Sequence, residues 1–270
     1  MAALHARSRP ASRARQGLAG LWRAAALLLL CGLSLQLYFL ARIALMALVA
    51  PQSTTFQRSE IWRLAVEKHQ VAWSQTWIDD GQIGAPLRRA VIASEDAGFV
   101  DHSGVEWDAL EKAWEKNQRA EAAAGRRQAQ LDQRAARGAS AKPKVEPKLV
   151  GGSTISQQLA KNLFLSGERT ALRKAQEFLL TLTLEALLGK RRILEIYLNH
   201  VEWGEGVFGA QAAARHYFRT DAARLDNAAA ARLAVMLPAP KRFEKNPGSA
   251  YVQGRAATIL ARMPAVALPR

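Results

Sequence analysis

The sequence predicts an all-α protein that carries one N-terminal membrane-spanning helix. Three observations support this prediction. Apolar residues recur at helical spacing through most of the chain, no segment alternates apolar and polar residues as a strand does, and one apolar stretch near the N-terminus is long enough to cross a bilayer. The length of 270 residues fits a single globular domain with some additional segments.

The composition is strongly basic, with 38 Lys+Arg against 23 Asp+Glu and a net charge of +15. This charge predicts an anionic partner. Nucleic acid is one class, but the sequence has no zinc-ligand spacing, RNA-binding aromatic signature or basic-leucine-zipper pattern. An anionic membrane surface and a pyrophosphate-bearing lipid account for the charge equally well. The single cysteine, Cys31, allows no intramolecular disulfide and no cysteine-based zinc site.

Residues 1–23 form a basic tail without acidic residues, and residues 24–50 are predicted to form a transmembrane signal-anchor helix. Gln36 and Arg42 interrupt the apolar stretch, but an arginine near its end can extend to the interface. A cleaved signal peptide is the alternative, because small residues precede Pro51, although the stretch is longer than a typical signal core. A cytoplasmic tail places the rest of the chain across the membrane, which argues against a nucleic-acid partner.

Residues 51–270 are predicted to form the globular domain. Its first part, residues 56–77, has helical spacing and predicts juxtamembrane helices, whose tryptophans lie either at the lipid interface or in the core. Pro86 begins the next predicted helix, which ends at the acidic pair Glu95–Asp96 and is followed by a loop.

Residues 116–148 are rich in Ala, Arg, Gln and Lys, contain few large apolar side chains and end with two prolines. Such a segment buries little surface. We therefore expect a mobile basic insertion that is at most partly helical.

The segment GGSTISQQLAKN, residues 151–162, predicts a loop followed by a helix. Its two glycines favour a loop, and Thr154 with Gln157 three positions later fits a capping box, so the helix is expected to begin near Ile155. The free N–H groups of a helix N-terminus and the nearby charge of Lys161 suit a phosphate-like anion. An ordinary capped surface helix is the alternative.

The C-terminal part of the chain continues with helices. Residues 171–188 are apolar nearly all round from Phe178 onward, which predicts a buried central helix. Further helices are expected at 190–201 and 210–218, separated by a glycine-rich turn, and within the segment 225–263.

Six segments resemble, in order and spacing, the motif series of the family 51 peptidoglycan glycosyltransferases: AVIASEDAGFVDHSG, GGSTISQQLAKN, RKAQE, KRRILEIYLN, GVFGAQAAARHYF and LAVMLPAPKRF. The resemblance covers residues 73–263, and with one anchor and no penicillin-binding domain the chain is similar to the monofunctional members. It implies a lysozyme-like, two-lobed helical fold. It also implies an inverting hexosyltransferase that polymerises lipid II outside the cytoplasmic membrane and releases undecaprenyl pyrophosphate.

The resemblance implies two catalytic glutamates. Glu95 matches the general base, which is required because a sugar hydroxyl is a poor nucleophile. Glu177 matches a second essential glutamate, near the leaving pyrophosphate or the reacting sugar. Taken alone, Glu95 suits a surface ion pair with Arg88 or Arg89. Glu177 alone suits either a helical salt bridge with the basic residues three and four positions before it or partial burial at the start of an apolar helix.

The resemblance also implies residues that bind the substrate. In the family, cationic side chains bind the pyrophosphate leaving group. The residues of this chain that match those cations are Lys161, Arg169, Arg173 and Lys174. The polar residues of the same cleft are Ser153, Gln157, Gln158 and Asn162, and Asp96 of the first motif is placed with them. A solvated surface charge is the alternative for each cation. Glu195, Tyr197 and Asn199 match a third motif and are expected to be scaffold.

No cofactor is expected to be required, and the sequence has no dedicated metal cage. His102 lacks partner ligands at useful spacing, which favours a structural hydrogen-bonding role. Some members of the family respond to divalent cations, and Mg²⁺ or Mn²⁺ can bridge the substrate pyrophosphate.

The insertion at 116–148 is longer than in typical relatives. Alanines at 228–231 stand where an acidic residue is usual, and we expect this to remove a local salt bridge but not catalysis.

The expected partners are lipid II, the growing glycan chain, membrane lipids and other proteins of cell wall synthesis or division, with no nucleic acid. The expected location is the bacterial inner membrane, with a cytoplasmic N-terminus and a periplasmic catalytic domain.

Two other functions stay open. A wall-degrading lytic transglycosylase or lysozyme shares the helical scaffold and an essential glutamate, but it needs no cationic site that binds a pyrophosphate. An inactive membrane scaffold needs neither Glu95 nor Glu177.

Overall fold

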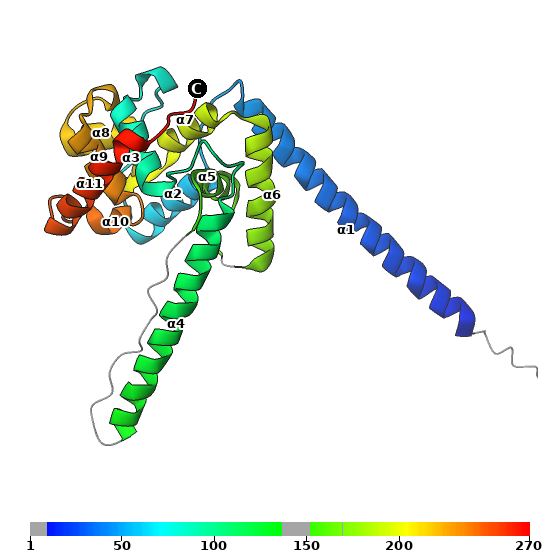
Figure 1. The fold of residues 1–270 in the computed structure, drawn as a ribbon. Helices are drawn as coiled ribbons and strands as arrows, with labels where there is room; N and C mark the ends of the chain where they lie inside the picture. Colours follow the sequence, from blue (N-terminus) through cyan, green and yellow to red (C-terminus); the bar gives the residue numbers. More distant parts are fainter. Residues whose placement is uncertain (1–9, 137–151, 169) are drawn as a thin grey trace, which may run out of the picture.

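The computed structural model describes residues 10–136, 152–168 and 170–270. This part of the chain is almost entirely helical, as predicted (Figure 1). Its α-helices are α1 Pro10–Met46, α2 Thr55–Glu67, α3 Ala85–Glu95, α4 Trp107–Ala136, α5 Ile155–Phe164, α6 Ala171–Leu187, α7 Lys190–His200, α8 Ala210–Phe218, α9 Asn227–Met236, α10 Pro240–Phe243 and α11 Ala250–Arg262. Short 3-10 helices are Asp80–Gln82, Ala222–Arg224 and Met263–Ala265.

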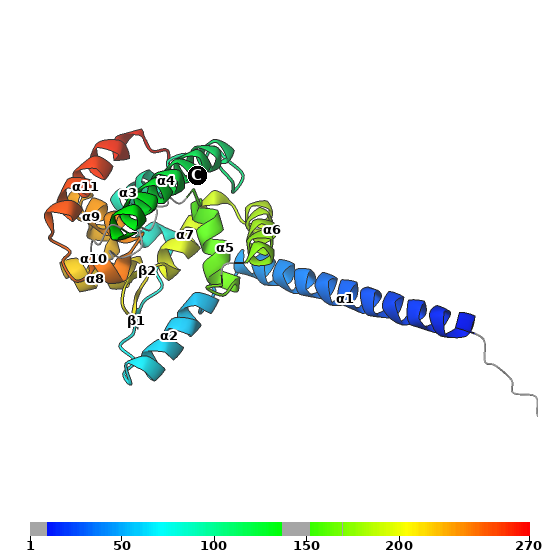
Figure 2. The same cartoon turned by 90° about the horizontal axis from the view of Figure 1, so that it is seen from below.

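The helices form two groups that meet at α7 (Figures 1 and 2). α3, α9 and α11 pack together in one group, and α5 and α6 pack together in the other, beside α2 and the end of α1. α7 contacts α5 and α6 as well as α8. Every residue of α7 from Ile193 to His200 is buried, so α7 is the central helix of the domain.

The prediction that residues 171–188 form the buried central helix is wrong. α6 packs on α5 and on α1 and buries Leu180 and Leu184, but Leu172, Leu179 and Leu182 are exposed. An apolar helix surface is satisfied by lipid as well as by protein, so an all-round apolar pattern does not distinguish the two environments.

The described residues of the basic insertion, 116–136, are more helical than we expected, and its predicted mobility stays a prediction. These residues belong to α4, which extends away from the domain as one continuous helix (Figure 1). The segment lacks large apolar side chains, but Ala, Arg, Gln, Glu and Lys are strong helix formers whether or not they are buried. Ion pairs along the helix, such as Arg119 with Glu115 at 3.2 Å, add to its stability. Residues 137–148 lie outside the described residues.

α1 also extends away from the domain (Figures 1 and 2). Residues 20–46 are long and apolar enough to cross a membrane, although a signal sequence near an N-terminus meets the same criterion. Most of this stretch is exposed, and its end packs on the domain through Ile43 and Met46. α1 therefore fits a single-pass membrane anchor, and the helix ends at Met46, before the predicted end at residue 50.

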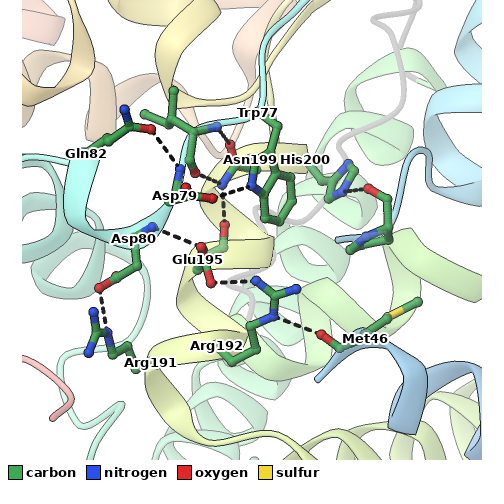
Figure 3. Close-up of polar contacts among 12 residues, drawn as sticks. Met46, Trp77, Asp79, Asp80, Gln82, Arg191, Arg192, Glu195, Asn199 and His200 are labelled. Carbon is green, nitrogen blue, oxygen red and sulfur yellow. Dashed lines mark hydrogen bonds and ion pairs between the residues drawn. The ribbon is translucent and has the colours of Figure 1, made fainter. Parts of the chain in front are cut away.

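Arg192 of α7 connects the anchor to the domain (Figure 3). Its Nε donates to the carbonyl oxygen of Met46 at 2.8 Å, and its Nη1 pairs with Glu195 at 2.7 Å. The last carbonyl groups of a helix lack helical partners, so this hydrogen bond caps the end of α1. Glu195 also accepts from the backbone N–H of Asp80 at 2.9 Å.

The segment that precedes α3 is held against α7 by Asn199 (Figure 3). Asn199 Oδ1 accepts from the Ile78 N–H, and Asn199 Nδ2 donates to the Ile78 carbonyl oxygen, both at 2.9 Å. The neighbouring tryptophans contact protein: Trp73 stacks on Phe208 with ring centroids 4.4 Å apart, and the Trp77 ring lies 5.6 Å from the Arg192 guanidinium. Trp73 and Trp77 are thus half-buried against protein, whereas Trp62 of α2 is 72% exposed, so the two interpretations apply to different tryptophans. The predicted juxtamembrane helix is confirmed over α2, but residues 68–77 are not helical.

Three short strands depart from the all-helical prediction: β1 Ser74–Gln75, β2 Glu202–Gly204 and β3 Val207–Phe208. β3 pairs in parallel with β1 and antiparallel with β2. The turn between β2 and β3 requires Gly206, which has φ +73°, and a Cβ at this position would lie 2.0 Å from the Ala72 carbonyl oxygen. Strands of two or three residues are too short to produce a visible alternation in the sequence.

We expect Gly206→Ala to destabilise the domain. The left-handed conformation alone costs about 1–2 kcal/mol for a residue with a Cβ, and the contact with the Ala72 carbonyl oxygen adds to this cost. The measurement is thermal unfolding in detergent, with Gly81→Ala as the control because a Cβ at Gly81 meets no atom within 4 Å. Equal midpoints for the two variants would contradict the prediction.

Candidate active site

A cavity of about 500 Å³ is lined by residues of α5 and α6, and by residues of α2, β2 and the turn between α9 and α10. It brings together most of the predicted site residues: Ser153, Gln157, Gln158, Lys161, Asn162, Arg173, Lys174 and Glu177. Arg169 lies outside the described residues. The cavity thus unites the segment GGSTISQQLAKN with the segment RKAQE.

The start of α5 is fixed by two sets of hydrogen bonds. In the predicted capping box, Thr154 Oγ1 accepts from the Gln157 N–H at 3.2 Å, and Gln157 Oε1 accepts from the Thr154 N–H at 3.1 Å. Asp96 Oδ2 accepts from the Ile155 N–H at 3.0 Å. We predicted that this helix N-terminus faces a substrate anion, but the protein's own Asp96 carboxylate occupies it. Of the two features of α5 predicted to suit an anion, only the Lys161 side chain faces the cavity.

Asp96 positions the start of α5 and does not line the cavity, so its predicted contact with substrate stays a prediction. It is buried, and its Oδ1 accepts from His102 Nε2 at 2.8 Å, while His102 Nδ1 accepts from the Gly104 N–H at 3.1 Å. Glu106 lies close enough to complete a group of three potential metal ligands. Because both Asp96 oxygens and both His102 nitrogens are already hydrogen bonded, this group is a structural network that fixes the start of α5.

Glu95 is the last residue of α3 and is half-buried. Gln158 Nε2 donates to its Oε2 at 3.0 Å, and Ser94 Oγ donates to its Oε1 at 3.3 Å. Burial raises the pKa of Glu95, these two hydrogen bonds oppose the shift, and the negative charge of Asp96 adds to it. A raised pKa suits a general base that works near neutral pH. Gln158 lines the cavity and so links Glu95 to it.

The ion pair proposed as the alternative role of Glu95 is not formed with Arg88. Arg88 instead pairs with Asp80 at 3.0 Å and donates from Nε to the Ile83 carbonyl oxygen at 2.9 Å. Glu95 is therefore left with neutral partners, which stabilise a carboxylate without neutralising its charge.

Tyr197 has a role that sequence reasoning missed. Its hydroxyl donates to Gln158 Oε1 at 2.9 Å, which orients the Gln158 amide so that Nε2 points to Glu95. Burial raises the pKa of Tyr197, and the negative charges of Glu95 and Asp96 raise it further, so this hydroxyl keeps its proton. No signal in the local sequence marks the role, because Gln158 lies on a different helix.

We expect Gln158→Leu to move the acidic limb of the pH–rate profile to higher pH. The Gln158 hydrogen bond lowers the pKa of Glu95, so its loss lets burial raise that pKa further, and a base is active only when deprotonated. The measurement is the initial rate of glycan formation against pH. Tyr197→Phe, which removes only the hydroxyl, should move the limb in the same direction but by less. An acidic limb that is unchanged in both variants would contradict this chain of hydrogen bonds.

Glu177 is buried at the cavity wall and pairs with two cations. Its Oε2 accepts from Arg173 Nη1 at 2.9 Å, and its Oε1 accepts from Lys174 Nζ. These are the helical neighbours that the sequence indicated, but the carboxylate is buried, so the group is more than a surface salt bridge. Arg173 Nε is buried and has no hydrogen-bond partner among the described residues. A buried donor beside a cavity is available to an anion.

Lys161 lines the same wall one turn after the start of α5. Burial lowers its pKa, the negative charge of Glu177 opposes this, and the positive charges of Arg173 and Lys174 add to it. Three cations stand beside two carboxylates here, the buried Glu177 and the exposed Glu168, so this wall keeps an excess of positive charge. An anionic ligand supplies the missing negative charge, and the pKa of Lys161 then rises.

Comparisons with known proteins identify the family of the chain. The sequence model of the Transglycosylase family matches residues 64–264. Relatives called biosynthetic peptidoglycan transglycosylase include proteins of Paraburkholderia phytofirmans, 46% identical over 238 residues (88% of this chain and 88% of the relative), and of Burkholderia thailandensis, 45% identical over 267 residues (98% and 94%). A relative of the same name from Bordetella pertussis is 45% identical over 234 residues (87% and 88%). Together with the helical, lysozyme-like fold, these matches show that the chain belongs to the transglycosylase family.

Proposed function

We propose that this enzyme is a peptidoglycan glycosyltransferase, which polymerises lipid II into β-1,4-linked glycan strands for cell wall synthesis and releases undecaprenyl pyrophosphate. One observation carries the proposal. A single cavity is lined by three cations, Lys161, Arg173 and Lys174, and by Gln158, which donates a hydrogen bond to the half-buried carboxylate Glu95 just behind the lining. Transfer of a sugar from a pyrophosphate needs both a base and an electrophilic site for the leaving group.

In the proposed reaction, Glu95 accepts the proton from the 4-hydroxyl of the acceptor sugar. The resulting oxygen nucleophile attacks the anomeric carbon of the donor, and a new C–O bond forms on the face opposite the leaving group. The bond from the anomeric carbon to the pyrophosphate oxygen breaks, and its electron pair leaves with the pyrophosphate. Lys161, Arg173 and Lys174 stabilise this developing negative charge.

We propose that the reaction needs no resident metal ion. The cavity wall that faces the pyrophosphate is already cationic, and its buried carboxylate, Glu177, is engaged by Arg173 and Lys174. A divalent cation such as Mg²⁺ or Mn²⁺ would therefore be held mainly by substrate oxygens, and would bridge the pyrophosphate without a protein cage.

The proposed location is the bacterial inner membrane. α1 crosses the bilayer, residues 1–23 lie in the cytoplasm, and the catalytic domain lies in the periplasm, as the excess of arginine in the tail favours. Membrane lipids then surround the exposed apolar surface of α1. Contact with other proteins of wall synthesis or division stays a prediction.

Purified protein tests the proposal. Incubated with labelled lipid II, it should yield a ladder of glycan polymers on a gel, and the same preparation should release nothing from finished peptidoglycan. Fragments from finished peptidoglycan without polymer would favour a wall-degrading enzyme. Inactivity on both substrates would favour a scaffold.

A further inference from the structure

The cavity has a second wall that differs in chemistry from the cationic one. It is formed by α2, β2 and the turn between α9 and α10, and in both views α10 lies on the side of α5 away from α6 (Figures 1 and 2). No lysine or arginine of this wall lines the cavity in the described part of the chain. Its lining is largely apolar, with one acidic and one hydroxyl side chain: Phe56, Ser59, Val201, Glu202, Leu237, Pro238 and Pro240.

Glu202 of β2 is buried, with 8% of its surface exposed, and its Oε1 takes part in an ion pair but lacks a hydrogen bond among the described residues. Lys241 Nζ lies 3.4 Å from this oxygen as an ion-pair neighbour, but it donates at 2.5 Å to Glu60 instead. A buried acceptor without a donor is costly, and such groups usually have a partner that is missing from the free protein.

The charged residues near Glu202 form a structural cluster. Arg63 donates to Glu60 at 2.7 Å and to Glu205 at 2.5 Å, which joins α2 to the turn between β2 and β3. Glu244 accepts from the Glu205 N–H at 2.6 Å and joins the same turn to α10. These contacts hold α2, the strands and α10 together, beside the longer 3.4 Å ion pair between Lys241 and Glu202.

The surroundings of Glu202 favour an uncharged partner. Burial raises the pKa of Glu202 to about 7; Lys241 opposes this shift, and the negative charges of Glu60 and Glu244 add to it. A cationic partner would be repelled by the ammonium of Lys241, and an anionic partner would be repelled by the neighbouring carboxylates. A neutral donor is compatible with both.

We propose that Glu202 binds the saccharide part of the substrate, by accepting a hydrogen bond from a sugar hydroxyl or an acetamido N–H while Phe56, Pro238 and Pro240 cover the apolar face of the ring. This inference rests on the proposed function, since it places a glycan in the same cavity. A largely apolar wall with a few convergent polar groups is the usual composition of a site that orients a neutral ligand.

The first test compares Glu202→Ala with Glu202→Gln in detergent-solubilised full-length protein. Glu202→Ala should raise KM for lipid II about three- to tenfold, the loss expected for one hydrogen bond, with a much smaller effect on kcat. Glu202→Gln keeps an acceptor oxygen and should recover most of the affinity. Glu205→Gln is the control on the same turn, because Glu205 does not line the cavity. An unchanged KM in Glu202→Ala would overturn the proposal.

Two lipid-linked glycans, the acceptor lipid II and the growing chain, present this chemistry. Rates are therefore measured with lipid II alone and with added lipid-linked tetrasaccharide. A defect of Glu202→Ala in both reactions assigns the wall to lipid II, and a defect only in extension of the tetrasaccharide assigns it to the growing chain. A defect in neither reaction overturns the inference.

A binding experiment separates this inference from the proposed function. The probe is the soluble β-1,4-linked tetrasaccharide of N-acetylglucosamine, which has no pyrophosphate, and the measurement is hydrogen–deuterium exchange of the wild-type protein. We expect slower exchange in residues 201–204 and 237–240, even if the protein proves inactive on lipid II. Because no variant is needed, a folding defect does not affect the result. Protection elsewhere only, or none at saturating probe, would contradict the inference.

Discussion

Glu95→Gln is expected to reduce the rate of glycan polymerisation by about 10²–10⁴-fold, the contribution typical of a general base. The amide keeps the size of the side chain and an oxygen for the Gln158 hydrogen bond, but it cannot accept a proton from the acceptor hydroxyl. The measurement is the initial rate on lipid II, with circular dichroism to verify the helical content.

Asp101→Asn provides the matched control for this substitution. Asp101 lies in the loop after α3, is exposed and does not line the cavity. It should retain the wild-type rate. If Glu95→Gln retained full activity while its fold was intact, the assignment of Glu95 as the base would be wrong.

Lys161→Met is expected to have the next largest effect, about 10²–10³-fold on kcat, by analogy with the removal of one group that stabilises developing charge in a transition state. Methionine keeps an unbranched apolar chain but lacks the ammonium that we place against the leaving pyrophosphate. The measurement is steady-state turnover of lipid II, because a charge that acts mainly in the transition state lowers kcat more than it raises KM.

Lys245→Met controls for the loss of positive charge alone, since Lys245 is exposed and does not line the cavity. Lys161→Arg should keep part of the activity, because arginine carries the charge in a different geometry. A large rise in KM with an unchanged kcat in Lys161→Met would indicate that Lys161 only attracts the substrate.

Local patterns in the sequence identified the parts of the site whose partners lie within one helical turn. The capping box of Thr154 and Gln157 and the pairing of Glu177 with Arg173 and Lys174 are examples, since all these partners are three or four positions apart. The helicity of α4 was predictable from the same local information. It was missed because we used the scarcity of apolar residues, which reports on burial, to judge a property that depends on backbone propensity.

Features that depend on distant partners could not be predicted in this way. Asp96 reaches the start of α5 across a sequence separation of 59 residues, and Tyr197 reaches Gln158 across 39. The identity of each residue was visible in the sequence, but its partner was not. Glu202 is intermediate: an acidic residue between the apolar Val201 and Trp203 is a sign of burial in the sequence, but only the structure shows that it lines the cavity and that its Oε1 lacks a hydrogen bond among the described residues.

The central claim is that one cavity joins a base to a cationic site for a pyrophosphate leaving group and thereby transfers a sugar with inversion. The most direct measurement follows wild-type protein with lipid II and determines both the anomeric configuration of each new bond, by NMR of the product, and the amount of undecaprenyl pyrophosphate released. The account predicts β-1,4 linkages and one released lipid pyrophosphate for each bond formed. Products with α linkages, or free disaccharide released by hydrolysis, would contradict it.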